Sequence, residues 1–206
     1  MTSQWTHVPN IDRTAVSQQV IEIVARALDQ DPAKVHLHSR LWGDLGAESL
    51  DMLDIAFGLE STFKIRVPHS DLLGRARDHF GEERIAPNGI LSEFALELIR
   101  RSMPELDPAQ IRSGLTPYEF RRTIPVESLV RVVMRLLEQK AQQTCPACSG
   151  RLADSESAPE LQCTQCGLTQ PYPSGEQIFM DDLVAVGSRI EAPGALSNGT
   201  APREAK

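Results

Sequence analysis

The chain has 206 residues, 41% of them hydrophobic, and a formal net charge of -7 at pH 7. This length is enough for one ordinary core and a smaller second module. The acidic balance disfavours nucleic-acid binding, which depends on a clustered basic surface, so we expect no nucleic-acid partner. Because the sequence has no run of 18 apolar residues and no cationic start followed by an apolar stretch, we expect no membrane partner and a cytoplasmic location.

Helical periodicity defines the first elements. Apolar residues recur at helical spacing over 14–29, which predicts an amphipathic helix. The pattern over 33–48 is irregular and predicts a long packed loop. A second helix is expected to begin at Ser49, a residue type that caps helices well, and to run to about Phe63. Its predicted apolar arc is wide and consists of Leu50, Met52, Leu53, Ala56, Phe57, Leu59 and Phe63. The opposite stripe consists of Asp51, Asp54, Gly58 and Ser61.

The remaining chain is expected to hold shorter elements. A turn over 70–73 precedes a charged segment, 75–89, which we interpret as a surface insertion. Further helices are predicted over 90–101 and 123–139. From 145 to 182, short runs broken by Gly, Pro and Ser predict small strands and turns.

Together these elements predict a mainly α fold in four parts. We expect a helical bundle over 10–103, additional helices over 104–141 and a small β module over 142–185. Residues 186–206 are rich in Ala, Pro, Gly, Ser and Asn and offer little to bury, so we expect a disordered tail.

One segment carries a resemblance to a known family. Asp44-Leu45-Gly46-Ala47-Glu48-Ser49-Leu50-Asp51 resembles the phosphopantetheine attachment motif of acyl carrier proteins, and the likeness extends over about 12–103. The resemblance implies a four-helix bundle of the acyl-carrier type and a covalent 4'-phosphopantetheine arm on Ser49 that holds an acyl or aminoacyl group as a thioester. The implied partners are a phosphopantetheinyl transferase and acyl-loading and acyl-processing enzymes. Glu48 stands where family members commonly have aspartate, which keeps the charge.

The physical chemistry of the segment agrees with that role. A phosphodiester on Ser49 would meet unpaired N–H groups and the positive end of a helix dipole. Acidic residues surround the serine without a basic one between Leu41 and Phe63. Such a surface steers basic docking patches of partner enzymes by charge. The predicted docking residues are Asp44, Glu48, Asp51 and Asp54.

All four cysteines fall in two C-x-x-C pairs, Cys145/Cys148 and Cys163/Cys166, separated by 14 residues. This spacing lets two turns converge on one tetrahedral Zn²⁺. Four thiolates leave no position for water or substrate, so we predict one structural zinc that stabilises a module too small to fold on its own core. A redox dithiol and two disulfides are the alternatives, but neither a thioredoxin-like context nor an export signal accompanies the cysteines.

The cysteine segment also resembles a second family. The runs Gly150-Arg151-Leu152, Cys166-Gly167-Leu168, Pro171-Tyr172-Pro173 and Ile178-Phe179-Met180-Asp181-Asp182 are similar to small zinc-ribbon proteins that act as partner subunits of methyltransferases. The resemblance implies a docking or stabilising module. The chain departs from that family at Ser174-Gly175-Glu176, so its partner surface is expected to differ.

No phosphate-binding glycine loop, nucleophile elbow or catalytic carboxylate pair is evident, so we expect a non-catalytic carrier that serves enzymes. An unmodified carrier-like adaptor that scaffolds an enzyme complex through the zinc ribbon is the main alternative. A nucleic-acid-binding zinc protein is a weaker one, because the segment 145–182 holds a single basic residue, Arg151.

Overall fold

The computed structural model describes residues 11–156 and 159–191. The fold is mainly helical, with one small three-stranded antiparallel sheet near the cysteines, as predicted. Within the described residues the chain divides into two compact units, each built from two separate stretches. The first unit comprises 11–69 and 121–178, and the second comprises 70–120 and 179–191.

The first two helices form where the periodicity predicts them. Helix α1 spans Arg13–Ala27 and is capped by Asp12, whose carboxylate accepts a hydrogen bond from Thr14 N–H. Helix α2 spans Ser49–Phe63. Its N-cap residue is Glu48, so Ser49 is the first helical residue and not the cap that we expected. The two helices pack against each other in the first unit.

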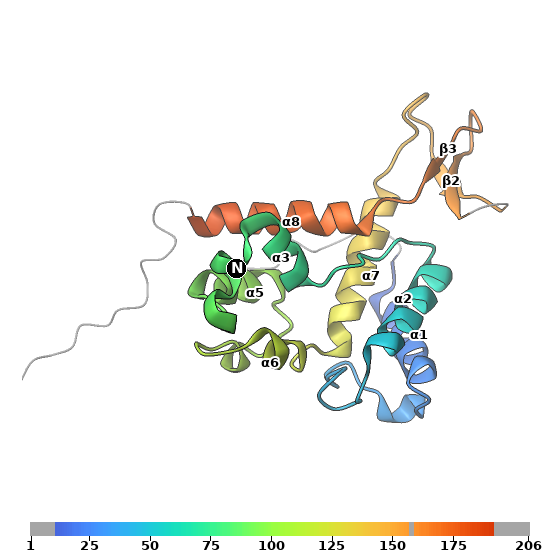
Figure 1. Ribbon diagram of the computed structural model, residues 1–206. Helices are drawn as coiled ribbons and strands as arrows, with labels where there is room; N and C mark the ends of the chain where they lie inside the picture. Colours follow the sequence, from blue (N-terminus) through green and yellow to red (C-terminus); the bar gives the residue numbers. More distant parts are fainter. Residues whose placement is uncertain (1–10, 157–158, 192–206) are drawn as a thin grey trace, which may run out of the picture. The chain divides into compact units, whose positions relative to one another are not determined.

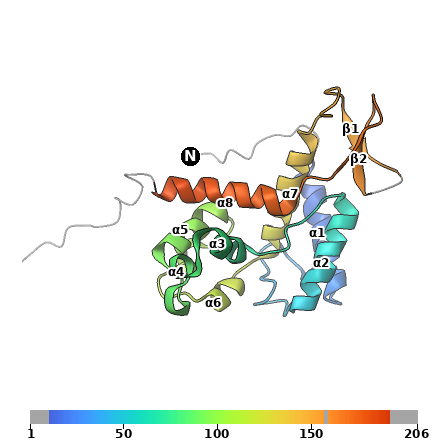
Figure 2. The same cartoon turned by 45° about the horizontal axis from the view of Figure 1, so that its top comes forward.

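The third member of this bundle comes from much later in the sequence. Helix α7 spans Val126–Ala141 and packs on both α1 and α2, as Figures 1 and 2 show. The expected partition, in which this helix lies outside a 10–103 bundle, therefore differs from the structure. The predicted helix 90–101 forms as α5, Glu93–Ser102, but it belongs to the second unit. Packing decides which helix joins the first unit. Helix α7 packs on α1, and its buried apolar residues are Val126, Val130, Val133 and Leu136.

Backbone pairing fixes the long loop before α2. Leu41 N–H donates to the carbonyl of Ile124, and Val126 N–H donates to that of Ser39. Glu127 N–H likewise donates to the carbonyl of Leu37. The segment that leads into α7 thus holds the loop that leads into the attachment motif.

Gly58 lies on the face of α2 that contacts α1, although the sequence pattern placed it on a polar stripe. A Cβ at this position would lie 2.7 Å from Ile23 Cγ2. Glycine is required here because it lets the two helices approach closely, and its cost to helix stability is about 1 kcal/mol.

Gly58→Ala is therefore expected to destabilise the protein despite the better helix propensity of alanine. Overpacking against the stiff, buried Ile23 costs about 1–3 kcal/mol, which outweighs the gain of about 1 kcal/mol. In an Ile23→Ala background the same substitution should instead stabilise, because the clashing methyl is gone. Urea unfolding of the four proteins measures the difference, and a sign that does not reverse would contradict this contact.

The second unit consists of short helices. They are α3 (Leu72–Phe80), α4 (Glu82–Ile85), the 3₁₀ turns η2 (Pro87–Gly89) and η3 (Pro108–Gln110), α5, most of α6 (Pro117–Arg121) and the greater part of α8 (Gly175–Glu191). The prediction of a surface insertion over 75–89 is wrong, because α3 and α4 bury Leu73, Ala76 and Ile85. Phe80 packs on Gly187 of α8, where an added Cβ would lie 2.4 Å from its ring.

The sheet forms within the cysteine segment. Strands β1 (Leu152–Asp154), β2 (Glu160–Cys163) and β3 (Thr169–Pro171) pair antiparallel in the order β1-β2-β3. The register places Leu152 opposite Cys163 and Gln162 opposite Thr169. After β3 the expected strands and turns give way to α8, which begins at Gly175.

The first residues of the predicted tail are helical instead. Residues 186–191 belong to α8, where Leu183 and Ile190 are buried. The rest of the predicted tail, 192–206, lies outside the described residues. Among the described helices, none combines the length and the apolar character needed to cross a lipid bilayer.

Candidate functional site

The structure presents Ser49 at the exposed N-terminus of α2. The chain reaches it through Gly46, whose φ of +71° is a left-handed conformation that favours glycine, and through buried Ala47. Ala47 N–H donates to the carbonyl of Leu41, and Gln30 Nε2 donates to that of Leu45. The hydroxyl of Ser49 is therefore accessible on a turn that the rest of the unit holds in place.

Asp44 is the first of the predicted docking residues, and it is engaged within the chain. Its carboxylate accepts hydrogen bonds from the Arg40 backbone N–H at 2.8 Å and from Arg40 Nη2 at 2.5 Å. These bonds lower the pKa of Asp44 to about 2. Arg40 thus offsets much of the charge that Asp44 would offer to a partner, and the pair closes the loop before Ser49.

Arg40→Met is expected to raise the pKa of Asp44 toward its ordinary value of 3.8. Because the folded-state pKa is depressed, the pair stabilises the fold above pH 3.8, and this contribution disappears as the pH falls through about 2. A carboxyl-carbon NMR titration measures the shift. Arg26→Met, which changes an exposed arginine on α1, is the control and should leave the Asp44 titration unaltered.

The other three predicted docking residues lie on the first turns of α2. Glu48 N–H donates to Asp51 Oδ2 at 2.7 Å, so Asp51 completes a capping arrangement at the helix start. Asp54 is exposed. The structure therefore brings Glu48, Ser49 and Asp51 together within one helical turn, where carboxylates also favour the helix dipole.

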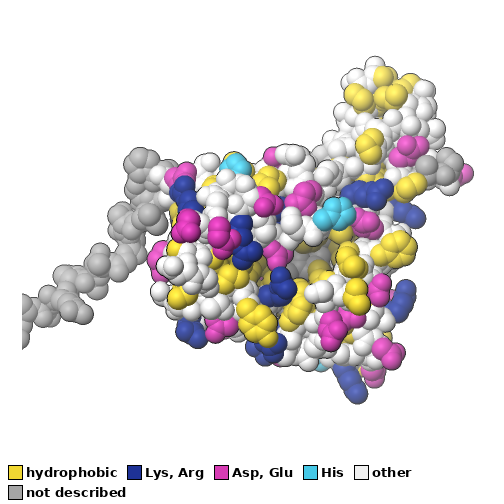
Figure 3. Space-filling model, viewed as in Figure 1, with side chains coloured by type: hydrophobic (Ala, Val, Ile, Leu, Met, Phe, Trp, Pro, Cys, Tyr) yellow, Lys and Arg dark blue, Asp and Glu magenta, His cyan; other side chains and the backbone are white. Residues whose placement is uncertain are grey.

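An exposed apolar stripe on the same helix forms part of the wide apolar arc that the sequence pattern predicts. Leu50, Leu53 and Phe57 are 74%, 66% and 74% exposed, whereas Ile55, Leu59 and Phe63 form the buried face. Hydrophobic side chains accordingly reach the surface beside acidic ones over α2 in Figure 3. We call Leu50, Leu53 and Phe57 the α2 stripe. The signal in the sequence was an apolar arc too wide for one buried face.

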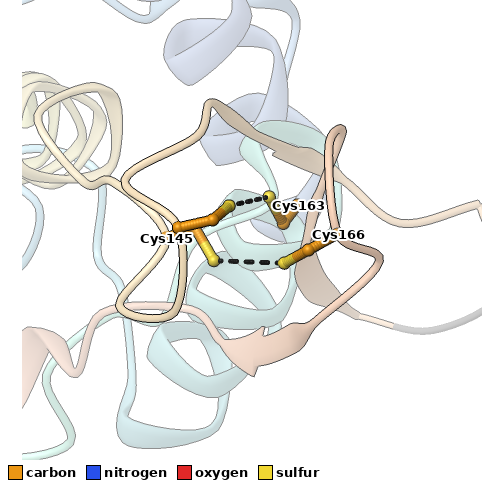
Figure 4. Close-up of side chains that lie close together, drawn as sticks. Cys145, Cys163 and Cys166 are labelled. Carbon is orange, nitrogen blue, oxygen red and sulfur yellow. Dashed lines mark hydrogen bonds between the residues drawn. The ribbon is translucent and has the colours of Figure 1, made fainter.

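The second site is the cysteine cluster. The four Sγ atoms all lie within 4.8 Å of one another. The close approaches run between the two motifs, with Cys145 Sγ 3.6 Å from Cys166 Sγ and Cys148 Sγ 3.5 Å from Cys163 Sγ (Figure 4). A disulfide needs a sulfur separation of about 2.05 Å and a redox C-x-x-C pair acts within its own motif, so the arrangement disfavours both alternatives.

Backbone groups surround these sulfur atoms with donors. Gln165 N–H donates to Cys163 Sγ at 3.4 Å. The backbone N–H groups of Cys166 and Gln165 lower the pKa of Cys163 to about 6. Gly167 follows the second pair with a φ of +75°, and a Cβ at Gly150 would lie 3.1 Å from Cys148 Sγ. The second turn therefore stabilises the thiolate of Cys163. The backbone N–H of Gly150 acts to lower the pKa of Cys148, but without an ion the neighbouring thiols outweigh it and raise this pKa to about 12.

The cluster fits a tetrahedral zinc ion. With Zn–S bonds of about 2.3 Å, the sulfur atoms of a tetrahedral site stand about 3.8 Å apart, close to the separations found here. Four sulfur ligands of this kind are typical of closed, structural zinc sites. The four predicted ligands are thus brought together on one centre next to the sheet.

Comparisons with known proteins match the N-terminal region. The family described as "Phosphopantetheine attachment site" matches residues 18–77. The "Acyl carrier protein" of Campylobacter concisus (strain 13826) is 39% identical over 57 residues, which are 28% of this chain and 74% of that protein. The "Acyl carrier protein" of Amoebophilus asiaticus (strain 5a2) is 33% identical over 76 residues, covering 34% of this chain and 94% of that protein. No solved structure matches the chain significantly.

Proposed function

Since this chain belongs to the acyl carrier protein family, we propose that it tethers acyl or aminoacyl groups as thioesters on a 4'-phosphopantetheine arm attached to Ser49. The observation that carries the proposal is the exposed hydroxyl of Ser49 at the first residue of α2, inside the matched region. The N–H groups at the start of a helix and the positive end of its dipole favour a phosphodiester there.

The chain's own residues would perform two tasks in this role. Ser49 Oγ would attack the phosphate of coenzyme A that carries the pantetheine and lose its proton to a base of the transferase. The pyrophosphate P–O bond would break, the adenosine bisphosphate would leave, and the serine oxygen would then carry the phosphodiester. The Arg40–Asp44 pair and Gly46 would hold the preceding turn in one conformation. When bound, the arm supplies a terminal thiol that forms the thioester, while this chain supplies no catalytic group for the transfer.

We propose that partner enzymes dock on α2 through two kinds of contact. Asp54, with Glu48 and Asp51, would meet basic patches and orient the encounter. The α2 stripe, Leu50, Leu53 and Phe57, would supply apolar area next to the arm. Asp44 would contribute less charge than the sequence suggests, because Arg40 already pairs with it.

We propose that Cys145, Cys148, Cys163 and Cys166 bind one structural Zn²⁺. The cross-motif sulfur separations and the backbone donors around them support this assignment. The ion would stabilise the ribbon, by which we mean the described residues from Cys145 to Pro173. Its described core is small and consists mainly of Leu161, Tyr172 and two of the cysteines.

The test is to incubate the full chain with coenzyme A and a broad-specificity phosphopantetheinyl transferase. The expected result is a mass gain of one phosphopantetheine, located by peptide fragmentation on the segment that contains Ser49. A chain that stays at its original mass while a known carrier in the same tube is modified would favour the unmodified adaptor instead.

A further inference from the structure

The side chain of Lys140, in the last turns of α7, contacts three segments of the first unit. Its Nζ donates to the carbonyl oxygen of Lys64 at 2.9 Å and lies 2.5 Å from Asp154 Oδ1. The same Nζ lies 4.8 Å from the centre of the Tyr172 ring. The Lys140 side chain is only 14% exposed. One ammonium group therefore binds both the end of α2 and the ribbon.

Each partner of this ammonium group suits a cation. Lys64 is the C-cap residue of α2, with a φ of +53°, and carbonyls at a helix C-terminus lack partners in their own helix and carry the negative end of its dipole. Asp154 ends β1 and supplies the opposite charge. Tyr172 is buried, and this burial, with the nearby Asp154 carboxylate, raises its pKa, so the phenol stays neutral beside the cation.

A second contact joins the same two parts. A Cβ at Gly175, just after the ribbon, would lie 2.2 Å from the carbonyl oxygen of Arg66, just after α2. Arg66 and Ser174 pair as an isolated parallel bridge, and His69 N–H donates to Glu176 Oε2 at 2.9 Å. The segment just after the ribbon is thus held against the segment just after α2, whereas the ribbon's own contact with the end of α2 is made by Lys140.

We propose that Lys140 couples the ribbon to the carrier helix, so that the order of the last turn of α2 depends on the folded, metal-loaded ribbon. The metal part rests on the proposed zinc site, whereas the Lys140 contacts do not. Loss of the metal would unfold the ribbon, remove Asp154 and Tyr172 from Lys140, and loosen the hold on the Lys64 carbonyl. Metal occupancy would thereby reach the helix on which partners dock, from the end opposite to Ser49.

Hydrogen exchange of the full chain, followed by mass spectrometry or NMR, tests the coupling. In the wild type, chelating the metal is expected to accelerate exchange of the α2 amides at 60–64 at least tenfold. In Lys140→Met, which keeps the aliphatic stem and removes the charge, these amides should already exchange fast with the metal bound, and chelation should add little. Lys34→Met, which changes an exposed lysine away from the Lys140 contacts, is the matched control and should behave as the wild type.

Zinc content, measured on the same samples, separates the two proposals. Bound zinc with α2 exchange that neither chelation nor Lys140→Met accelerates would overturn the coupling and leave the metal site standing. If the wild type binds no zinc, the proposed metal site is wrong, and Lys140→Met is compared with Lys34→Met alone. Equal exchange of the amides at 60–64 in the two variants would overturn the role of the Lys140 contacts. Faster exchange in Lys140→Met would support it. If Lys140→Met does not fold, Asp154→Asn tests the same contact from its exposed partner. It should accelerate exchange of the amides at 60–64 by a smaller factor.

Discussion

Ser49→Ala is expected to abolish attachment of the phosphopantetheine arm while leaving the fold intact. The variant lacks the only atom of residue 49 that can accept the phosphoryl group. Helix α2 should persist, because Glu48 is its N-cap and Asp51 accepts the Glu48 N–H, and alanine is a good helix former. Intact mass after incubation with a transferase measures the effect, which should be complete within the sensitivity of the spectrometer.

Ser61→Ala provides a matched control for this experiment. Ser61 is also exposed on α2, and its hydroxyl donates to the carbonyl of Gly58. The control should accept the arm to the same extent as the wild type. Modification of Ser49→Ala at the wild-type level would place the arm on another residue and would refute the proposed function at this site.

Cys163→Ser is expected to have the second large effect, the loss of the metal and of the ribbon fold. Cys163 is buried, ends β2 and receives two backbone N–H donors, so a serine there leaves a site with three sulfur ligands and a misplaced hydroxyl. Structural zinc contributes on the order of 10–16 kcal/mol to small metal-dependent folds, far more than the ribbon's own core supplies. Metal analysis should fall from one zinc per chain to about none.

The two variants serve as controls for each other. Ser49→Ala should keep its zinc, and Cys163→Ser should still accept the arm, because the turn before Ser49 is held by Arg40, Gln30 and Leu41, none of which belongs to the ribbon. Full zinc retention in Cys163→Ser would mean that the metal binds elsewhere.

Periodicity and capping in the sequence predicted the helices that matter locally. The predicted start of α2 at Ser49 and its end at Phe63 are confirmed, because the pattern and the end signals agree there. The spacing of the cysteines likewise predicted that all four would meet. Both are short-range features, in which residues close in sequence fix their own geometry.

The partition of the helices could not be read in the same way. The predicted helices 90–101 and 123–139 are both amphipathic, and only long-range packing decides which of them covers α1. The exposure of the α2 stripe was missed for a related reason: Leu50, Leu53 and Phe57 look like core residues until the position of α1 is known. Gly58, placed on a polar stripe from the sequence, marks the true contact face.

The late arrival of α7 has a consequence for synthesis on the ribosome. Helices α1 and α2 are complete at residue 63, but the helix that covers them begins at residue 126. At a synthesis rate of ~5–20 residues per second, several seconds pass before α7 can pack on the apolar side of α1. A chain that ended before α7 would therefore lack part of the cover of α1 and would be expected to expose apolar surface that favours aggregation.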